Sequence, residues 1–390
     1  MFKIKIYNKI ALDRLSAFDT AFTVGNEVED PDGILVRSYK LHDIEFNKSL
    51  KVIGRAGAGV NNIPVDMCTK NDIVVFNTPG ANANAVNELV LSGMLLAARN
   101  IIEGAAFLNG IKNNENIGKL VEEAKSEFKG FELKGKKLGI IGLGSIGLKV
   151  ANMAISLGLE VIGFDPFLSE EGIDEISEQI KLVNNLDLVL SESDMISLHI
   201  PLSAETRDFL NEDCFQRMKS NVVLLNFSRA EIINEVALLK ALEKGSINRY
   251  VTDFPNKALL ENENVICLPH LGASTREAEE NCALMIGKQV ADYLINGNIK
   301  NSVNFPDIYL EREGSFRLAV TSDYDPGLIE HVTTILIEYG LNMRQILSKS
   351  KGPLTYTILD VETEPTEEAL EKINSIAGVK VVRLLVERDS

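Results

Sequence analysis

Residues 136–165 read KKLGIIGLGSIGLKVANMAISLGLEVIGFD and predict a strand, a glycine turn, a helix and a second strand. The apolar run before Gly142 is too short for a helix, and apolar residues return at helical spacing after Gly147. Gly142 permits a tight turn, Gly144 lets backbone N–H groups approach a phosphate at the helix N-terminus, and Gly147 lets helix and strand pack closely. The stretch therefore predicts a dinucleotide-binding turn.

Asp165 ends the second predicted strand, about 18 residues after Gly147. A carboxylate there can accept hydrogen bonds from both ribose hydroxyls and would repel a 2′-phosphate, so the residue favours NAD over NADP. Ser145 and Ile146 complete the turn and are also assigned to the cofactor. A glycine turn that binds nothing is the alternative, but strand, helix, second strand and terminal acid all stand in the register of a dinucleotide site.

Composition limits the classes of protein that need to be considered. A chain of 390 residues with 45% hydrophobic and 25% charged residues is an ordinary globular protein of several domains. Its formal net charge of -16 argues against nucleic acid or an anionic membrane as a partner. No apolar run is long enough to span a bilayer, and residues 1–6 resemble a strand more than a signal peptide, so we expect a cytoplasmic location. The four cysteines have no CxxC spacing and the four histidines are scattered, so no metal site is predicted.

The order of predicted elements indicates an α/β chain. Strand and helix patterns alternate over residues 1–80, which predicts a small parallel domain of flavodoxin-like type. A doubly wound Rossmann domain is expected over residues 89–274. Residues 274–277 have capping-box spacing and open a long helix that we expect to cross back to the first domain. The substrate-binding domain would then be discontinuous, made of residues 1–88 and 275–305.

The pattern changes in the last part of the chain. Residues 312–390 hold a βαββαβ order in about 75 residues, which predicts a ferredoxin-like module. The module contains no obvious catalytic residue. Its last strand, 379–386, could pair with a second copy of the chain, so the module is a candidate for oligomerisation or effector binding.

Two strand ends carry side chains suited to catalysis. His270, in PHLGAST (269–275), stands between a strand and a helix and can exchange a proton with a hydroxyl or carbonyl oxygen at neutral pH. Arg229 also follows a strand, and its guanidinium can bind a carboxylate by two parallel bonds. A core histidine and a surface arginine are the alternatives. His199, one strand away, is interpreted as structural or adjacent to the cofactor.

Taken together, these residues resemble the D-isomer-specific 2-hydroxyacid dehydrogenases. The resemblance covers essentially the whole chain, and its motifs are GRAGAGVNN (54–62), NTPGANANAVNEL (77–89), GIIGLGSIG (139–147), HIPL (199–202), NFSRAEIINE (226–235), PHLGAST (269–275), YDPG (324–327) and GLNM (340–343). The length and the C-terminal module are similar to those of members with an ACT domain that oxidise 3-phospho-D-glycerate to 3-phosphohydroxypyruvate at the entry to serine synthesis. A homo-oligomer, dimer or tetramer, is expected by the same likeness.

The resemblance also implies a role for each matching residue. His270 would be the acid and base, and Arg229 would clamp the substrate carboxylate. Further substrate contacts are expected at Arg37, Arg55, Gly57 and Asn82. The remaining cofactor contacts are expected at Ala58, Ile200, Pro201, Phe227, Ser228, Asp253, Gly272 and Ala273. Two arginines suit a phosphate, which weighs against a substrate such as glycerate or 2-hydroxyglutarate. A non-catalytic NAD-sensing protein is the alternative from another class.

The sequence departs from the family pattern beside the catalytic histidine. Lys257 stands where relatives have the glutamate that pairs with that histidine. Either the lysine points to solvent and His270 works unpaired, or another acid such as Asp253, Glu261 or Glu263 replaces the glutamate. We assign Asp253 to the cofactor, with a weaker expectation that it also orients His270.

Other departures lie outside the catalytic centre. Ala230 replaces a glycine and Ile200 replaces a threonine. Ser322 and Tyr324 occupy positions where serine-regulated relatives carry a histidine and an asparagine, whereas Asn342 fits the effector position. The resemblance therefore leaves feedback by serine open.

Overall fold

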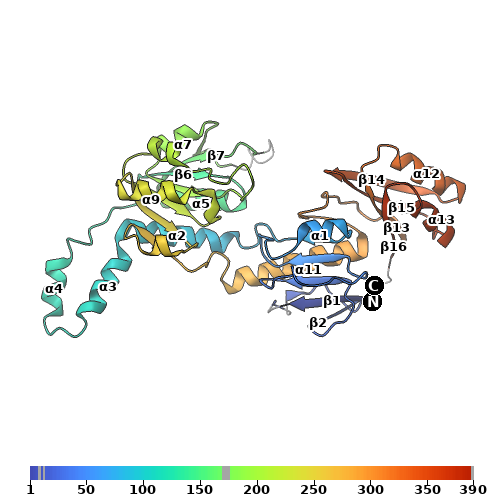
Figure 1. Ribbon diagram of the computed structural model, residues 1–390, viewed down its shortest axis with the longest axis horizontal. Helices are drawn as coiled ribbons and strands as arrows, with labels where there is room; N and C mark the ends of the chain where they lie inside the picture. Colours follow the sequence, from blue (N-terminus) through green and yellow to red (C-terminus); the bar gives the residue numbers. More distant parts are fainter. Residues whose placement is uncertain (8–9, 12–13, 169–175, 388–390) are drawn as a thin grey trace. The chain divides into compact units, whose positions relative to one another are not determined.

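The computed structural model describes residues 1–390 except 8–9, 12–13, 169–175 and 388–390 (Figure 1). The chain forms two compact units. The first unit comprises Met1–Ala81 and Glu279–Ser390, and the second unit comprises Asn82–Ala278. The chain re-enters the first unit within the long helix α11 (Arg276–Asn296).

The first unit contains a five-stranded parallel sheet of order β2-β1-β3-β4-β5. Its strands are β1 (Phe2–Tyr7), β2 (Phe22–Gly25), β3 (Gly33–Val36), β4 (Val52–Arg55) and β5 (Val74–Phe76). Ile286 and Val290 of α11 are buried against one face, and Cys68 of α1 (Val65–Lys70) belongs to the core on the other face. The order is that of a flavodoxin-like fold, as predicted. The short strand β2 was not predicted, because its residues FTVG contain only two large apolar side chains, with Thr23 between them.

The second unit contains a seven-stranded parallel sheet of order β12-β11-β10-β9-β6-β7-β8. Its strands are β6 (Lys137–Ile141), β7 (Glu160–Phe164), β8 (Ile180–Leu182), β9 (Met195–Leu198), β10 (Val222–Asn226), β11 (Ile247–Thr252) and β12 (Val265–Cys267). Successive residues Ile140 and Ile141 of β6 belong to separate cores, so both faces of the sheet are covered. The predicted doubly wound Rossmann fold is confirmed, with its strand order reversing at β6.

Helices surround the second sheet. They are α2 (Ala83–Arg99), α5 (Ser145–Ser156), α7 (Leu186–Glu192), α8 (Glu212–Arg217), α9 (Glu235–Glu243) and α10 (Lys257–Leu260). Two further helices, α3 (Ile101–Ile111) and α4 (Ile117–Ala124), extend away from the body of this unit (Figure 1). Within the described residues no single helix has the length and apolar composition to cross a membrane; α2 and α3 meet that criterion only as a pair bent by 64°.

The C-terminal part of the first unit has the predicted βαββαβ order. Its elements are β13 (Phe316–Asp323), α12 (Leu328–Glu338), β14 (Met343–Lys351), β15 (Leu354–Val361), α13 (Glu367–Asn374) and β16 (Val379–Val386). The strands form an antiparallel sheet of order β14-β15-β13-β16, which is the ferredoxin-like arrangement. Helices α12 and α13 cover one face. Tyr356 on the other face packs with Phe305 and donates a hydrogen bond to the carbonyl of Gly297 at 2.9 Å.

A buried ion pair inside this module holds an arginine that also reaches the end of α11. Arg317 Nε lies 2.6 Å from Asp360 Oδ1, and both side chains are inaccessible to solvent. Arg317 also donates to the carbonyl of Asn296 at 3.0 Å. Arg312 donates to the carbonyl of Ile295 at 3.2 Å, and Arg383 donates to that of Leu294 at 3.2 Å. The module is therefore held on the first unit by polar as well as apolar contacts.

Candidate active site

Six strands of the second sheet end in predicted site residues. Gly142 follows β6, Asp165 follows β7, Ile200 follows β9, Phe227 follows β10, Asp253 follows β11 and His270 follows β12. All strands are parallel, so these residues share the carboxyl edge of the sheet, where open α/β sheets bind ligands. Along that edge the histidine and the glycine turn are separated by the ends of β11, β10 and β9.

The geometry of the glycine turn suits a pyrophosphate. Gly142 has φ +95°, and a Cβ at this position would lie 2.7 Å from the carbonyl carbon of His199. A Cβ at Gly147 would lie 2.0 Å from the carbonyl oxygen of Gly142. Gly144 precedes α5 and has open space where a side chain would stand. The turn therefore leaves room for a phosphate beside the positive end of the helix.

Asp165 holds the glycine turn, in addition to its predicted contact with a ribose. Oδ2 accepts a hydrogen bond from the backbone N–H of Leu143 at 2.9 Å, and Oδ1 accepts from that of Phe167 at 3.0 Å. A carboxylate accepts about four hydrogen bonds, so lone pairs remain for ribose hydroxyls. The sequence predicted the contact with the ribose but not the hydrogen bond that holds the turn.

The turn after β10 presents Arg229. Asn226 Nδ2 donates to the carbonyl of Arg229 at 2.8 Å, and Asn226 Oδ1 accepts from the N–H of Ser228 at 3.0 Å. Ser228 Oγ donates to the carbonyl of Leu198 at 2.7 Å, which ties the turn to β9. Arg229 Nη1 donates to the carbonyl of Ser228 at 2.6 Å, and within the described residues its other N–H groups have no protein acceptor. They are available to a carboxylate.

Asn226 is a residue that the sequence reasoning missed. Its side chain is fully buried and fixes the conformation of the arginine turn through both ends of its amide. The available signal was an asparagine at the end of the apolar strand VVLLN, a place where a buried amide needs partners.

His270 is exposed and lies against Phe254. The two rings meet edge to face with their centroids 5.0 Å apart. Lys257 points into solvent with 90% of its side chain exposed, and its Nζ lies 3.7 Å from Glu261. Among the described residues no carboxylate forms an ion pair with His270.

Asp253 is the acid beside this histidine. It is 1% exposed, and its Oδ2 accepts a hydrogen bond from the N–H of Gly272 at 3.2 Å. Its Oδ1 is buried and has no partner. Burial raises the pKa of the Asp253 carboxyl, whereas the nearby His270 and the N–H of Gly272 oppose the rise. A buried oxygen without a donor fits an amide such as the carboxamide of nicotinamide, so the residues at this edge fit NAD.

His199 lacks the properties of an acid or base. Its Nε2 lies 2.9 Å from Ser197 Oγ, and burial lowers the pKa of His199 to about 4. The ring is therefore neutral at physiological pH, which favours a structural role.

The predicted substrate arginines lie in the first unit, at the carboxyl edge of its sheet. Arg37 follows β3 and Arg55 ends β4, and Arg55 Nε donates to the carbonyl of Arg37 at 3.2 Å. A Cβ at Gly57 would lie 2.5 Å from Arg55 Nη1, so the glycine makes room for this guanidinium. Ala58 is exposed in the same loop, and its carbonyl accepts from Asn77 Nδ2 at 2.6 Å.

The other predicted residues have separate places. Asn82 precedes α2 in the second unit, and its Oδ1 is buried without a partner. Pro201, Ala273, Ser145 and Ile146 lie in the loops and the helix start at the carboxyl edge of the second sheet.

In the C-terminal module, Asn342 donates to Glu362 Oε2 at 3.2 Å. Ser322 is buried there and Tyr324 is exposed.

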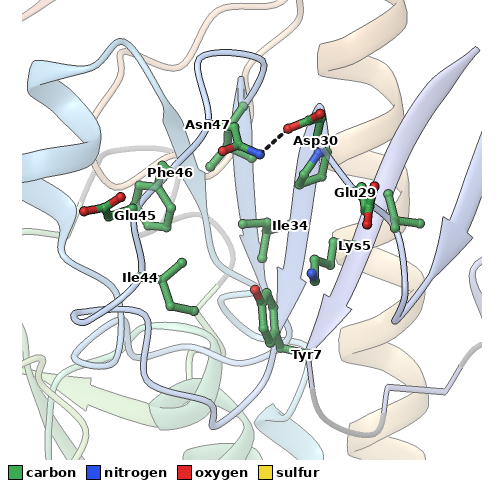
Figure 2. A pocket seen from close by; sticks show the side chains of 12 residues that line it. Lys5, Tyr7, Glu29, Asp30, Ile34, Ile44, Glu45, Phe46 and Asn47 are labelled. Atoms are coloured by element: carbon green, nitrogen blue, oxygen red, sulfur yellow. Dashed lines mark hydrogen bonds between the residues drawn. The ribbon is translucent and has the colours of Figure 1, made fainter.

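A pocket of about 320 Å³ lies elsewhere in the first unit (Figure 2). Lys5 and Tyr7 of β1 line it together with loop residues that precede β3 and β4, among them Asp30 and Asn47. These loops meet the sheet at the amino ends of the strands, opposite the substrate arginines. Asn47 donates to Asp30 at 2.5 Å, and Lys5 Nζ lies 5.5 Å from the centre of the Tyr7 ring. Asp30 and Asn47 thus pair with each other, and we assign no part of the active site to this pocket.

Comparisons with known proteins agree with this geometry. A model of the D-isomer specific 2-hydroxyacid dehydrogenase NAD-binding domain matches residues 91–272. The D-3-phosphoglycerate dehydrogenase of Haemophilus influenzae is 32% identical over 88% of this chain and 83% of its own length. That of Methanocaldococcus jannaschii is 35% identical over 80% of this chain, and the match spans only 59% of that relative's length.

A solved structure is also similar. The NAD⁺-bound 3-phosphoglycerate dehydrogenase of Entamoeba histolytica matches 78% of this chain and 98% of its own, with a TM-score of 0.62 and 28% identity. The chain therefore belongs to the D-isomer specific 2-hydroxyacid dehydrogenase family, and residues 91–272 are its NAD-binding domain.

Proposed function

We propose that the protein is an NAD-dependent dehydrogenase that oxidises 3-phospho-D-glycerate to 3-phosphohydroxypyruvate, the first step of L-serine biosynthesis. The observation that carries the proposal is the row of Arg229, Asp253 and His270 at the ends of the adjacent strands β10, β11 and β12. The relatives named D-3-phosphoglycerate dehydrogenase support the choice of substrate.

Arg229, His270 and Asp253 have separate roles in the proposed reaction. Bound NAD supplies the acceptor for the hydride that leaves C2 of the substrate. Arg229 binds the carboxylate and fixes C2, because its free N–H groups match two carboxylate oxygens. His270 takes the proton of the C2 hydroxyl as the carbonyl forms. Asp253 would hold the carboxamide of the cofactor through its unpaired Oδ1.

The phosphate distinguishes this substrate from other 2-hydroxy acids. Arg37 and Arg55 provide two positive charges for it in the first unit. Glycerate and 2-hydroxyglutarate carry no phosphate, so they would make no use of this pair of positive charges. A dehydrogenase for such an acid is the second candidate, and a non-catalytic NAD-binding protein is the third.

The deciding experiment measures NAD reduction with 3-phosphoglycerate, glycerate, lactate and 2-hydroxyglutarate. We expect the highest kcat/KM with 3-phosphoglycerate and loss of turnover in the His270→Asn variant. Equal kcat/KM for glycerate would contradict the phosphate assignment. Tight NAD binding without turnover of any of the acids would support the non-catalytic alternative.

The same proposal includes a cytoplasmic homo-oligomer with an ACT-type regulatory module. Helix α3 has no buried residue, and Ile101, Ile102 and Leu108 on it are exposed, which suits a contact with a second copy. Asn342 is the candidate effector contact in the module. Light scattering of the purified chain should give a dimer or tetramer, and Leu108→Asp should lower the mass if α3 forms the contact.

A further inference from the structure

Arg37, a proposed substrate arginine, already has an acidic partner. Its Nη1 lies 2.6 Å from Oε1 of Glu279, near the start of α11. The arginine side chain is 32% exposed and the glutamate side chain 44%. Both groups belong to the first unit and are open to water and to a ligand.

The charges of Arg37, Arg55 and Glu279 all act on the Cys282 thiol. Burial raises the pKa of the Cys282 thiol, one helical turn after Glu279; Arg55 and Arg37 lower it, and Glu279 raises it. Two guanidinium groups and one carboxylate therefore share the carboxyl edge of this sheet. An arriving phosphate would find Arg37 paired with Glu279 and the like charge of that carboxylate beside it.

We propose that Glu279 is an internal counter-ion of Arg37 that the substrate's phosphate must displace, so that Glu279 sets the KM for the phosphorylated substrate. This proposal rests on the proposed function, in which Arg37 binds that phosphate. Half-exposed ion pairs hold weakly, so Glu279 can turn to water at small cost when a dianion takes its place. A phosphate also offers the guanidinium a bidentate acceptor.

The pair therefore acts on affinity and not on chemistry. A substrate without a phosphate has no need to displace Glu279, so its KM should not depend on this residue. Removing the charge of Glu279 should strengthen phosphate binding by roughly three- to tenfold. The phosphate then has no ion pair with Arg37 to displace, and it is no longer repelled by the carboxylate.

The test compares two neighbouring glutamates on the same helix. Glu279→Gln should lower KM for 3-phosphoglycerate by roughly three- to tenfold and leave kcat within about twofold, with KM for glycerate unchanged. Glu280→Gln is the matched control, because Glu280 pairs with Arg14 at 2.8 Å instead of Arg37. It should leave both KM values near those of the wild type. An unchanged or higher KM in Glu279→Gln would overturn the proposal.

A second measurement does not depend on turnover. Inorganic phosphate is titrated into the wild type, Glu279→Gln and the double variant Glu279→Gln with Arg37→Ala, and its dissociation constant is measured by calorimetry. We expect tighter binding in Glu279→Gln and loss of that gain in the double variant. If 3-phosphoglycerate is not oxidised but this pattern holds, the proposed substrate fails and the counter-ion stands. Equal gains in Glu279→Gln and Glu280→Gln, or no detectable phosphate binding in any variant, would refute the counter-ion.

Discussion

Two buried carboxylates of this chain have opposite surroundings. Asp360, 0% exposed, accepts hydrogen bonds from Arg317 Nε at 2.6 Å and Nη2 at 2.8 Å, from Gln345 at 2.7 Å and from the N–H of Glu313 at 2.9 Å. Asp253, 1% exposed, accepts one from the N–H of Gly272 at 3.2 Å and has an unpaired Oδ1.

The pKa values of the two carboxyls are shifted in opposite directions. Burial alone would raise the pKa of Asp360, but hydrogen bonds from Arg317, Glu313 and Gln345 hold it below its usual value. Burial raises the pKa of Asp253, and its few partners do not reverse the rise. The two equally buried carboxylates thus differ: Asp360 has its partners within the fold, and Asp253 keeps an oxygen without a donor, which we propose for the cofactor.

The largest expected effect is on stability. Asp360→Ala should lower the free energy of unfolding by about 3–5 kcal/mol, because it leaves the Arg317 charge buried and unpaired. Asp253→Asn should change it by no more than about 1 kcal/mol. Urea unfolding of both variants provides the measurement. Replacing both partners, with Arg317→Met and Asp360→Leu together, is the control and should recover much of the loss. Similar losses in Asp360→Ala and Asp253→Asn would remove the distinction.

The second expected effect is on catalysis, where the change at Asp253 should cost more than the change at Asp360. If Asp253 has the proposed role, Asp253→Asn should reduce kcat/KM about ten- to a hundredfold, because both the proposed contact with the carboxamide of NAD and the carboxylate near His270 are lost. Asp360→Asn should retain near-normal kcat/KM in the fraction that remains folded. Steady-state kinetics at a temperature well below unfolding tests the pair. Full activity in Asp253→Asn would show that its free oxygen has no ligand.

The third effect is the pH dependence of stability, where the two residues have opposite signs. The lowered pKa of Asp360 contributes stability above the unfolded value of about 3.9, and this is lost as pH falls through the folded pKa. The raised pKa of Asp253 contributes stability below about 3.9, which is lost as pH rises through its folded value. Unfolding free energies measured from about pH 2 to 8 should therefore converge for wild type and Asp360→Asn as pH falls below about 3.9. Relative to wild type, Asp253→Asn should gain stability toward neutral pH.

The smallest effect concerns the lysine at the family's glutamate position. Because Lys257 points into solvent, Lys257→Glu should move the acid limb of the kcat/KM profile upward by less than about half a pH unit. Asp253→Asn should change kcat/KM far more than Lys257→Glu does, since Asp253 is the buried acid near His270. A larger change of kcat/KM in Lys257→Glu than in Asp253→Asn would assign the histidine's partner to position 257.

Local patterns were sufficient for the sheets and the strand ends. Gly142 and Asp165 follow apolar strands directly and His270 comes three residues after the end of one, so their sharing one edge follows from the parallel order. Features that depend on contacts between distant residues were not predictable. The Arg317–Asp360 pair joins residues 43 positions apart, and the sequence also left open whether Lys257 faces the histidine or solvent.

Three arginines that follow α11 in the chain, Arg312, Arg317 and Arg383, couple the folding of the C-terminal module to that of the helix. A helix leaves its last four carbonyls without intrahelical donors, and here each of the carbonyls of residues 293–296 accepts a hydrogen bond from Arg383, Arg312 or Arg317. The helix is thus capped by a module that follows it in the chain. Deleting residues 312–390 would remove the cap and uncover the apolar contact of Phe305 with Tyr356. The module and the parallel sheet of the first unit should therefore melt in one transition, and amide protons of the last turn of α11 should exchange at the rate of global unfolding.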